Sequence, residues 1–289
     1  EPAMRGWVNA LANYTEPVPV GAVMRSLATG QVVASHHPAY QSGDFVTGPF
    51  GWQDYAVVDA KTIQRKLTDP DLPISTSLGV LGLNGLTAYF GLLEVGRPKV
   101  GDTVLVSAAA GAVGTMVGQI AKIMGCRVIG TAGGQDKCDW LVKELGFDAA
   151  VDYKAGNVFR PLRAAAPNGI DVYFDNTGGP VLDAAIALMN LKGRIACCGN
   201  VSQYDVEKPA PGPMTVPGLV VTKRLRMEGF IVMDFYDQRA EAERRLAQWI
   251  ADGRIKAEVD ILDGLERAPE ALIGMLDGNN RGKRAVRVS

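Results

Sequence analysis

The stretch that decides the fold is Thr103-Val104-Leu105-Val106-Ser107-Ala108-Ala109-Ala110-Gly111-Ala112-Val113-Gly114. Its first five residues are typical of a short buried strand, and residues 113–124 carry apolar side chains at helical spacing. A Gly-rich turn between a strand and a helix is suited to the diphosphate of a dinucleotide, because the helix start offers free N–H groups and a positive dipole end. We predict such a site at Gly111, Ala112, Val113, Gly114 and Thr115.

Ala109 replaces the first glycine of the usual pattern, so an Ala- and Gly-rich turn without a ligand stays the alternative. The context on both sides favours the dinucleotide site, because strand-like and helix-like segments alternate from about residue 75. Predicted strands cover residues 103–107, 126–130, 149–153, 170–175 and 194–198, and predicted helices cover 113–124, 137–145 and 238–252. Apolar strands that alternate with helices predict the α/β class with a doubly wound parallel sheet.

The two ends of the chain have a different texture. Up to about residue 70 the sequence is rich in Gly, Pro, Val and Thr, and the short runs 30–35 and 55–58 predict strands of a small β unit. After Gly253 come short strands, a helix over 269–277 and a last strand over 284–288. This tail is too small for a domain, and we expect it to pack back on the N-terminal β unit.

Composition excludes several classes of partner. The 289 residues are 47% hydrophobic, and 30 Lys and Arg nearly balance 31 Asp and Glu, for a net charge of -1. This balance gives no electrostatic case for nucleic acid or an anionic membrane, and no apolar run has the length of a membrane span. The four cysteines lack the spacing of a structural zinc site or a disulfide framework, which favours free thiols and a cytoplasmic location.

The residues that follow the predicted strand over 126–130 indicate which cofactor, NAD or NADP, the chain binds. NAD sites usually carry a carboxylate at the end of this strand to bind the ribose 2′-hydroxyl, but here Thr131-Ala132-Gly133-Gly134 follows. The missing carboxylate removes a repulsion from a 2′-phosphate, and Lys137 can pair with that phosphate. We therefore predict NADPH, although from the residues alone Lys137 can equally be a solvated surface lysine.

Several motifs, in order along the whole chain, now identify a family. They are Glu1–Gly6, Gly85–Leu92, Ala108–Gly114 with Gln119–Lys122, Phe174–Gly179, Cys198–Tyr204 and Gly278–Lys283. With them the chain resembles the zinc-independent medium-chain dehydrogenase/reductases, and most closely the prostaglandin reductases, plant alkenal double-bond reductases and bacterial curcumin reductases.

The resemblance implies a division into two domains. Residues 1–78 and 252–289 would form a chaperonin-10-like β domain, and residues 79–251 a Rossmann domain that binds NADPH. Members of the group carry further strands before the segment that matches residues 1–6, so we expect the β domain to be N-terminally incomplete in this sequence. The resemblance also implies a homodimer.

The same resemblance implies cofactor contacts beyond the diphosphate turn, whose matching residues are Ala112 to Thr115. The further residues are Lys137 at the 2′-phosphate, Tyr153 near the adenosine phosphate, Asn176 by the nicotinamide ribose, Cys198, Gly199, Asn200, Val201, Ser202 and Tyr204 over the nicotinamide, Phe230, Ile231 and Val232 at the carboxamide, and Asn280 from the other domain.

The reaction implied is NADPH-dependent reduction of the C=C bond of an α,β-unsaturated ketone or aldehyde. Hydride reaches the β-carbon and negative charge builds on the carbonyl oxygen as an enolate, so the site must stabilise that oxyanion and supply a proton to the α-carbon. The resemblance points to Tyr204 as the hydrogen-bond donor, and a neutral phenol suits this role. Tyr204 could instead only line the pocket. Tyr14 is expected near the substrate. Alternatively, its side chain only packs against its neighbours and has no role in binding.

A zinc mechanism is not expected, because His36 and His37 are adjacent and no cysteine lies in the N-terminal β unit with them. Three other functions stay open. They are an NADPH quinone oxidoreductase of the same superfamily, a non-catalytic NADPH-binding protein, and an enoyl reductase that acts on acyl thioesters.

Overall fold

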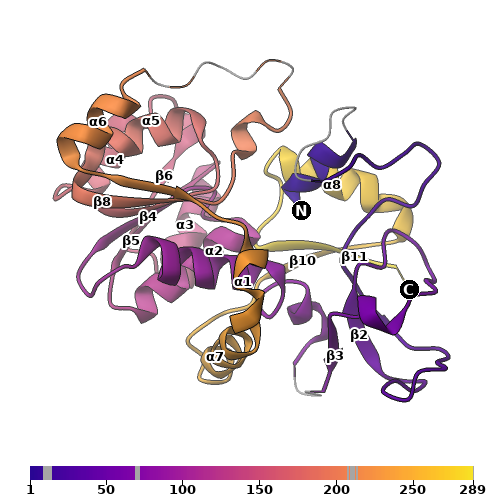
Figure 1. Ribbon diagram of the computed structural model, residues 1–289. Helices are drawn as coiled ribbons and strands as arrows, with labels where there is room; N and C mark the ends of the chain where they lie inside the picture. Colours follow the sequence, from indigo (N-terminus) through magenta and orange to yellow (C-terminus); the bar gives the residue numbers. More distant parts are fainter. Residues whose placement is uncertain (9–14, 69–71, 207, 209–211, 213, 289) are drawn as a thin grey trace.

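The centre of the protein is a six-stranded sheet in which all neighbouring strands are parallel (Figure 1). The computed structural model describes residues 1–8, 15–68, 72–206, 208, 212 and 214–288. The strand order is β6-β5-β4-β7-β8-β9, which reverses direction between β4 and β7. The strands are β4 Thr103–Val106, β5 Arg127–Ala132, β6 Ala149–Asp152, β7 Ile170–Asp175, β8 Met189–Cys197 and β9 Arg226–Gly229.

Helices cover both faces of this sheet, because successive side chains of a strand point to opposite sides. Val104 and Val106 belong to a core with α1 Leu83–Phe90, α2 Ala112–Ile123, α3 Gln135–Leu145 and α7 Arg239–Ala251. Leu105 belongs to a second core with α4 Phe159–Ala165, α5 Gly179–Leu188 and α6 Val216–Lys223. The predicted α/β class with a doubly wound sheet is confirmed, and its order is that of a Rossmann domain.

The predicted segments differ from the observed ones mainly at their ends. Strand β8 begins at Met189, five residues before the expected start at Arg194, and α3 begins at Gln135 rather than Lys137. Strand β9 was not indicated by the sequence, because it is a mostly exposed edge strand with Arg226 and Glu228 in place of an apolar run.

Three antiparallel strands form the N-terminal β unit: β1 Ala28–Gln31, β2 Phe45–Gly48 and β3 Arg65–Leu67. The prediction of a strand at residues 55–58 is wrong, because this run belongs to no strand. The side chains of Tyr55 and Val57 are exposed. A β-type composition gives a strand only where the side chains find a surface to pack on.

The C-terminal tail contains β10 Val259–Asp263, α8 Ala268–Leu276 and β11 Lys283–Arg287, with β10 and β11 paired in parallel. Helix α8 packs on the 3₁₀ helix η1, Pro2–Val8, as Figure 1 shows. Just before β11, Gly282 N donates to Ala110 O at 2.8 Å. The tail thus contacts the N-terminal segment and the diphosphate turn, and the domain division near residues 78 and 252 stays a proposal.

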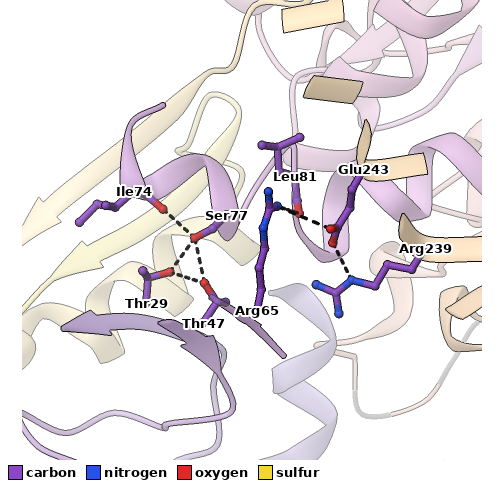
Figure 2. Close-up of polar contacts among 8 residues, drawn as sticks. All are labelled: Thr29, Thr47, Arg65, Ile74, Ser77, Leu81, Arg239 and Glu243. Atoms are coloured by element: carbon purple, nitrogen blue, oxygen red, sulfur yellow. Dashed lines mark hydrogen bonds and ion pairs between the residues drawn. The ribbon is translucent and has the colours of Figure 1, made fainter. Parts of the chain in front are cut away.

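Polar contacts join the N-terminal β unit to the Rossmann part (Figure 2). Ser77 Oγ lies 2.7 Å from Thr29 Oγ1 and 3.1 Å from Thr47 Oγ1, so it links β1 and β2 to the segment that leads into α1. Arg65 of β3 donates to Leu81 O at 3.1 Å and lies 3.8 Å from the carboxylate of Glu243 in α7. These contacts hold the β unit against the helices beside the sheet.

Candidate active site

Several of the predicted site residues lie at the carboxyl ends of β4 and β7, where the strand order reverses. Ligands of open α/β sheets bind at this switch point, because the loops after the two strands run in opposite directions and leave a crevice. The diphosphate turn follows β4 and Asn176 follows β7.

The diphosphate turn begins with Ala108, whose φ of 46° is left-handed. Ala108 O accepts the N–H of Gly111 at 3.0 Å, and α2 starts at the next residue without a side-chain cap. A Cβ on Gly114 would lie 2.3 Å from Ala108 O, so only glycine fits there. The uncapped N–H groups of the first turn of α2 lack intrahelical partners and suit an anion such as a diphosphate.

The carboxylate of Asp175 organises the end of β7. It is buried, and its Oδ1 accepts hydrogen bonds from Tyr173 Oη at 2.7 Å, Ser107 Oγ at 3.2 Å, Thr177 N at 2.9 Å and Gly178 N at 2.8 Å. Burial and the neighbouring Asp175 hold the pKa of Tyr173 well above its usual range, so the phenol stays a donor. Asp175 was not among the predicted site residues, although an acidic residue at the end of an apolar strand can indicate a functional site.

Asn176 joins the ends of the two central strands. Its Nδ2 donates to Ser107 O at 2.7 Å, and its N–H donates to Ser107 Oγ at 2.9 Å. The loop Cys198–Tyr204 then folds over this point: Val201 N donates to Asn176 O at 3.1 Å, and Ser202 Oγ donates to Thr177 O at 2.6 Å. The structure therefore brings together Asn176 and the loop predicted to cover the nicotinamide.

Tyr204 ends this loop, directly after the 3₁₀ helix η6, Val201–Gln203. Its hydroxyl accepts the N–H of Asn200 at 3.4 Å and lies 3.3 Å from the position of a Cβ on Gly199. Because the hydroxyl acts as an acceptor in this contact, its own proton remains available for a ligand. The next residue, Asp205, forms an ion pair of 2.6 Å with Arg5 from η1.

The predicted 2′-phosphate residue Lys137 contacts the C-terminal tail. Its Nζ donates to Asn280 O at 2.7 Å and to Gly278 O. Burial lowers the pKa of the Lys137 ammonium. Asn280 is buried and donates from Nδ2 to Gly282 O at 2.9 Å. Lys137 and Asn280, 143 positions apart in the sequence, are thus in contact.

The segment expected at the carboxamide directly follows β9. Phe230 packs edge-to-face on Phe174 with ring centroids 6.1 Å apart, Val232 is buried and Ile231 is exposed. This packing brings the segment to the same edge of the sheet as the diphosphate turn. Tyr14 lies outside the described residues.

A pocket of about 400 Å³ lies between η1 and α8. Asp205, the neighbour of Tyr204, forms part of its wall, and most of the remaining lining is apolar. The lining residues are Arg5, Val8, Met24, Trp52, Asp205, Pro269, Leu272, Ile273, Leu276 and Asp277.

Potential metal ligands are dispersed. Within the described part of the chain, no three His, Cys, Asp or Glu side chains are grouped to hold a metal ion. Both histidines are exposed, and burial raises the pKa of the Cys198 thiol to about 12, which keeps it neutral. A zinc-free mechanism stays a prediction. The helices of the described segments include none that is long and apolar enough to cross a bilayer.

Comparisons with known proteins agree with this geometry. Residues 112–252 match the family model of a zinc-binding dehydrogenase, and residues 1–65 match that of an N-terminal domain of oxidoreductase. The chain is 45% identical to an NADPH-dependent curcumin reductase of Escherichia coli over 100% of this chain and 85% of the relative. It is 42% identical to an NADP⁺-dependent 2-alkenal reductase of Nicotiana tabacum over 100% of this chain and 84% of the relative.

A solved structure of a related enzyme indicates the same family. CurA from Vibrio vulnificus in complex with NADPH is similar with a TM-score of 0.94 and 43% identity, over 100% of this chain and 87% of that one. The chain therefore belongs to the double-bond reductase group of the medium-chain dehydrogenase/reductases, NADPH-dependent enzymes that reduce the C=C bond of α,β-unsaturated ketones and aldehydes.

Proposed function

We propose that this chain reduces an enone or enal at Tyr204, with NADPH bound along the carboxyl edge of the parallel sheet and without a zinc ion. One observation carries the proposal: the diphosphate turn, Asn176 and the loop ending at Tyr204 are tied to one another through Ser107 and Thr177. These hydrogen bonds support one continuous site rather than separate structural turns.

The residues present fit NADPH. The uncapped start of α2 and the bare backbone at Gly114 suit the diphosphate, and the ammonium of Lys137 suits a 2′-phosphate. The remaining cofactor contacts proposed are Tyr153, Asn176, the loop Cys198–Tyr204, Phe230, Ile231, Val232 and Asn280.

Bound NADPH supplies the hydride that the substrate's β-carbon accepts. The chain's own contribution is to orient the carbonyl group and to stabilise the charge that develops on its oxygen. Tyr204 is the proposed donor to this oxygen, because its hydroxyl takes up the Asn200 N–H as an acceptor and keeps its proton for the ligand.

Consumption of NADPH with a panel of substrates tests the function. The panel contains a long-chain 2-alkenal, an aryl enone, a quinone and a simple ketone, and mass spectrometry identifies the product. Conversion of the enal or the aryl enone to the saturated carbonyl compound is the expected result. Turnover of the quinone alone would favour the quinone oxidoreductase, and NADPH binding without any turnover would favour a non-catalytic binder.

The substrate's apolar part is proposed to occupy the pocket beside Tyr204. We expect Ile273→Trp, which narrows this pocket, to raise KM for an aryl enone by about 10-fold and to leave KM for a short enal unchanged. The control is Val142→Trp, which replaces another exposed aliphatic residue, on α3 and outside the pocket lining. Equal changes for both substrates in the Ile273 variant would contradict this assignment of the pocket.

Removal of metal ions is expected to leave activity intact. The reason is that Tyr204, rather than a Lewis acid, is proposed to stabilise the developing charge. Dialysis against a strong zinc chelator, followed by the NADPH assay and elemental analysis of the protein, checks this. Loss of activity that added zinc restores would show that the zinc-free mechanism is wrong.

A homodimer and a cytoplasmic location complete the proposal. The homodimer is implied by the resemblance, and the cytoplasmic location is supported by the four cysteines, which lack the spacing of a disulfide framework. The balanced composition supports a partner that is neither nucleic acid nor a membrane. Light scattering on the purified protein and fractionation of the source cells measure them directly.

A further inference from the structure

Lys154 lies next to the proposed 2′-phosphate site and has no role in the function derived so far. It follows β6, in the 3₁₀ helix η5, Tyr153–Ala155. Asp152 Oδ1 accepts the N–H groups of Lys154 at 2.8 Å and Gly134 at 2.9 Å. This shared acceptor fixes the start of the Lys154 side chain beside the loop that follows β5.

The side chain of Lys154 runs over the bare backbone of that loop. A Cβ on Gly133 would lie 2.9 Å from Lys154 Cε and 3.0 Å from the hydroxyl of Tyr153. In a Rossmann domain the end of the second strand, here β5, is where the ribose 2′-position of a dinucleotide lies. Lys154 therefore reaches this position from β6, as Lys137 reaches it from α3.

The two ammonium groups meet at the same turn of the C-terminal tail. Lys137 Nζ donates to Asn280 O at 2.7 Å, and Lys154 Nζ donates to Asp277 O at 3.4 Å. Among the described residues neither ammonium forms an ion pair with a carboxylate. The nearby Arg281 and Arg284 differ, because they pair with Asp136 at 2.9 Å and Asp260 at 2.7 Å.

Two positive charges thus converge with only backbone carbonyls as partners. A carbonyl is a weaker acceptor for an ammonium than a charged oxygen is, so a phosphate can replace it. A phosphomonoester carries close to two negative charges at neutral pH and three acceptor oxygens, which matches two ammonium groups rather than one.

We propose that Lys154 is a second ammonium ligand of the 2′-phosphate, and that it acts with Lys137 to select NADPH over NADH. The inference rests on the cofactor site proposed above and extends it by one residue. The turn from Asp277 to Asn280 accepts hydrogen bonds from both ammonium groups and so holds them at one place.

Calorimetric titration of the full chain with 2′,5′-ADP and with 5′-ADP tests this, because the two probes differ in the 2′-phosphate. We expect Lys154→Gln to raise Kd for 2′,5′-ADP by about 5- to 20-fold and to leave Kd for 5′-ADP unchanged. Lys137→Gln is expected to have the same selective effect. Lys143→Gln, an exposed lysine of α3 that pairs with Asp139, is the matched control.

The two lysine variants separate the possible failures. A selective loss in Lys137→Gln without one in Lys154→Gln would overturn the inference and leave the proposed cofactor site standing. Equal weakening of both probes in Lys154→Gln would also overturn it, because the lysine would then act through the shape of the loop. Unchanged binding in both variants would contradict the proposed 2′-phosphate site itself.

Discussion

A Tyr204→Phe enzyme is expected to lose about 100- to 1,000-fold in kcat for an enone, the effect of removing one donor from a developing oxyanion. The substitution removes only the hydroxyl, whose contact in the structure is the 3.4 Å acceptor interaction with Asn200 N. Folding should therefore be nearly unchanged, and NADPH binding should weaken far less than kcat, because the ring that is proposed to face the cofactor is kept. Steady-state kinetics, NADPH titration and thermal unfolding of the variant give the three measurements.

Tyr55→Phe is the matched control, because Tyr55 is exposed in the N-terminal β unit. It should retain the wild-type kcat. If Tyr204→Phe also keeps its kcat, the tyrosine only lines the pocket and the donor is another group. If Tyr204→Phe weakens NADPH binding as strongly as it lowers kcat, its role is to hold the loop Cys198–Tyr204.

Replacing Asp175 with alanine is expected to lower the free energy of unfolding by about 3 kcal/mol or more, because buried donors would lose a charged acceptor. These donors include Tyr173 Oη and the N–H groups of Thr177 and Gly178. The apparent Tm should fall by roughly 6–12 °C. NADPH affinity should also fall, since the same carboxylate shapes the turn that places Asn176.

Differential scanning calorimetry of the variant, with and without NADPH, measures both effects. Asp183→Ala is the control, because Asp183 is an exposed residue of α5, where such a change should cost little. Asp175→Asn keeps one oxygen acceptor and should lie between wild type and Asp175→Ala. A Tm of Asp175→Ala equal to that of Asp183→Ala would show that the hydrogen bonds at Asp175 contribute little to stability.

Local pattern was enough to predict the class of the fold. Two patterns, the apolar run Val104–Val106 and the helical spacing after Gly111, can be recognised from consecutive residues alone. The strand and the helix that they predict lie where expected. Where burial is one-sided or absent, the pattern failed: the edge strand β9 was not predicted, and the exposed run at residues 55–58 was wrongly predicted as a strand. Composition alone does not show whether a segment has a neighbour to pack on.

The sequence by itself determined the doubly wound class and the turn between β4 and α2, and the missing carboxylate after β5 indicated NADPH. The turn and the missing carboxylate each lie within a few consecutive residues, and the class follows from the alternation of such local patterns along the chain, so all three can be recognised before the chain is folded. Only the tertiary structure decided that Lys137 meets Asn280, that Asp205 pairs with Arg5 and that Lys154 faces the same turn as Lys137. Such contacts join residues 100 or more positions apart, and packing of the whole chain sets their distances.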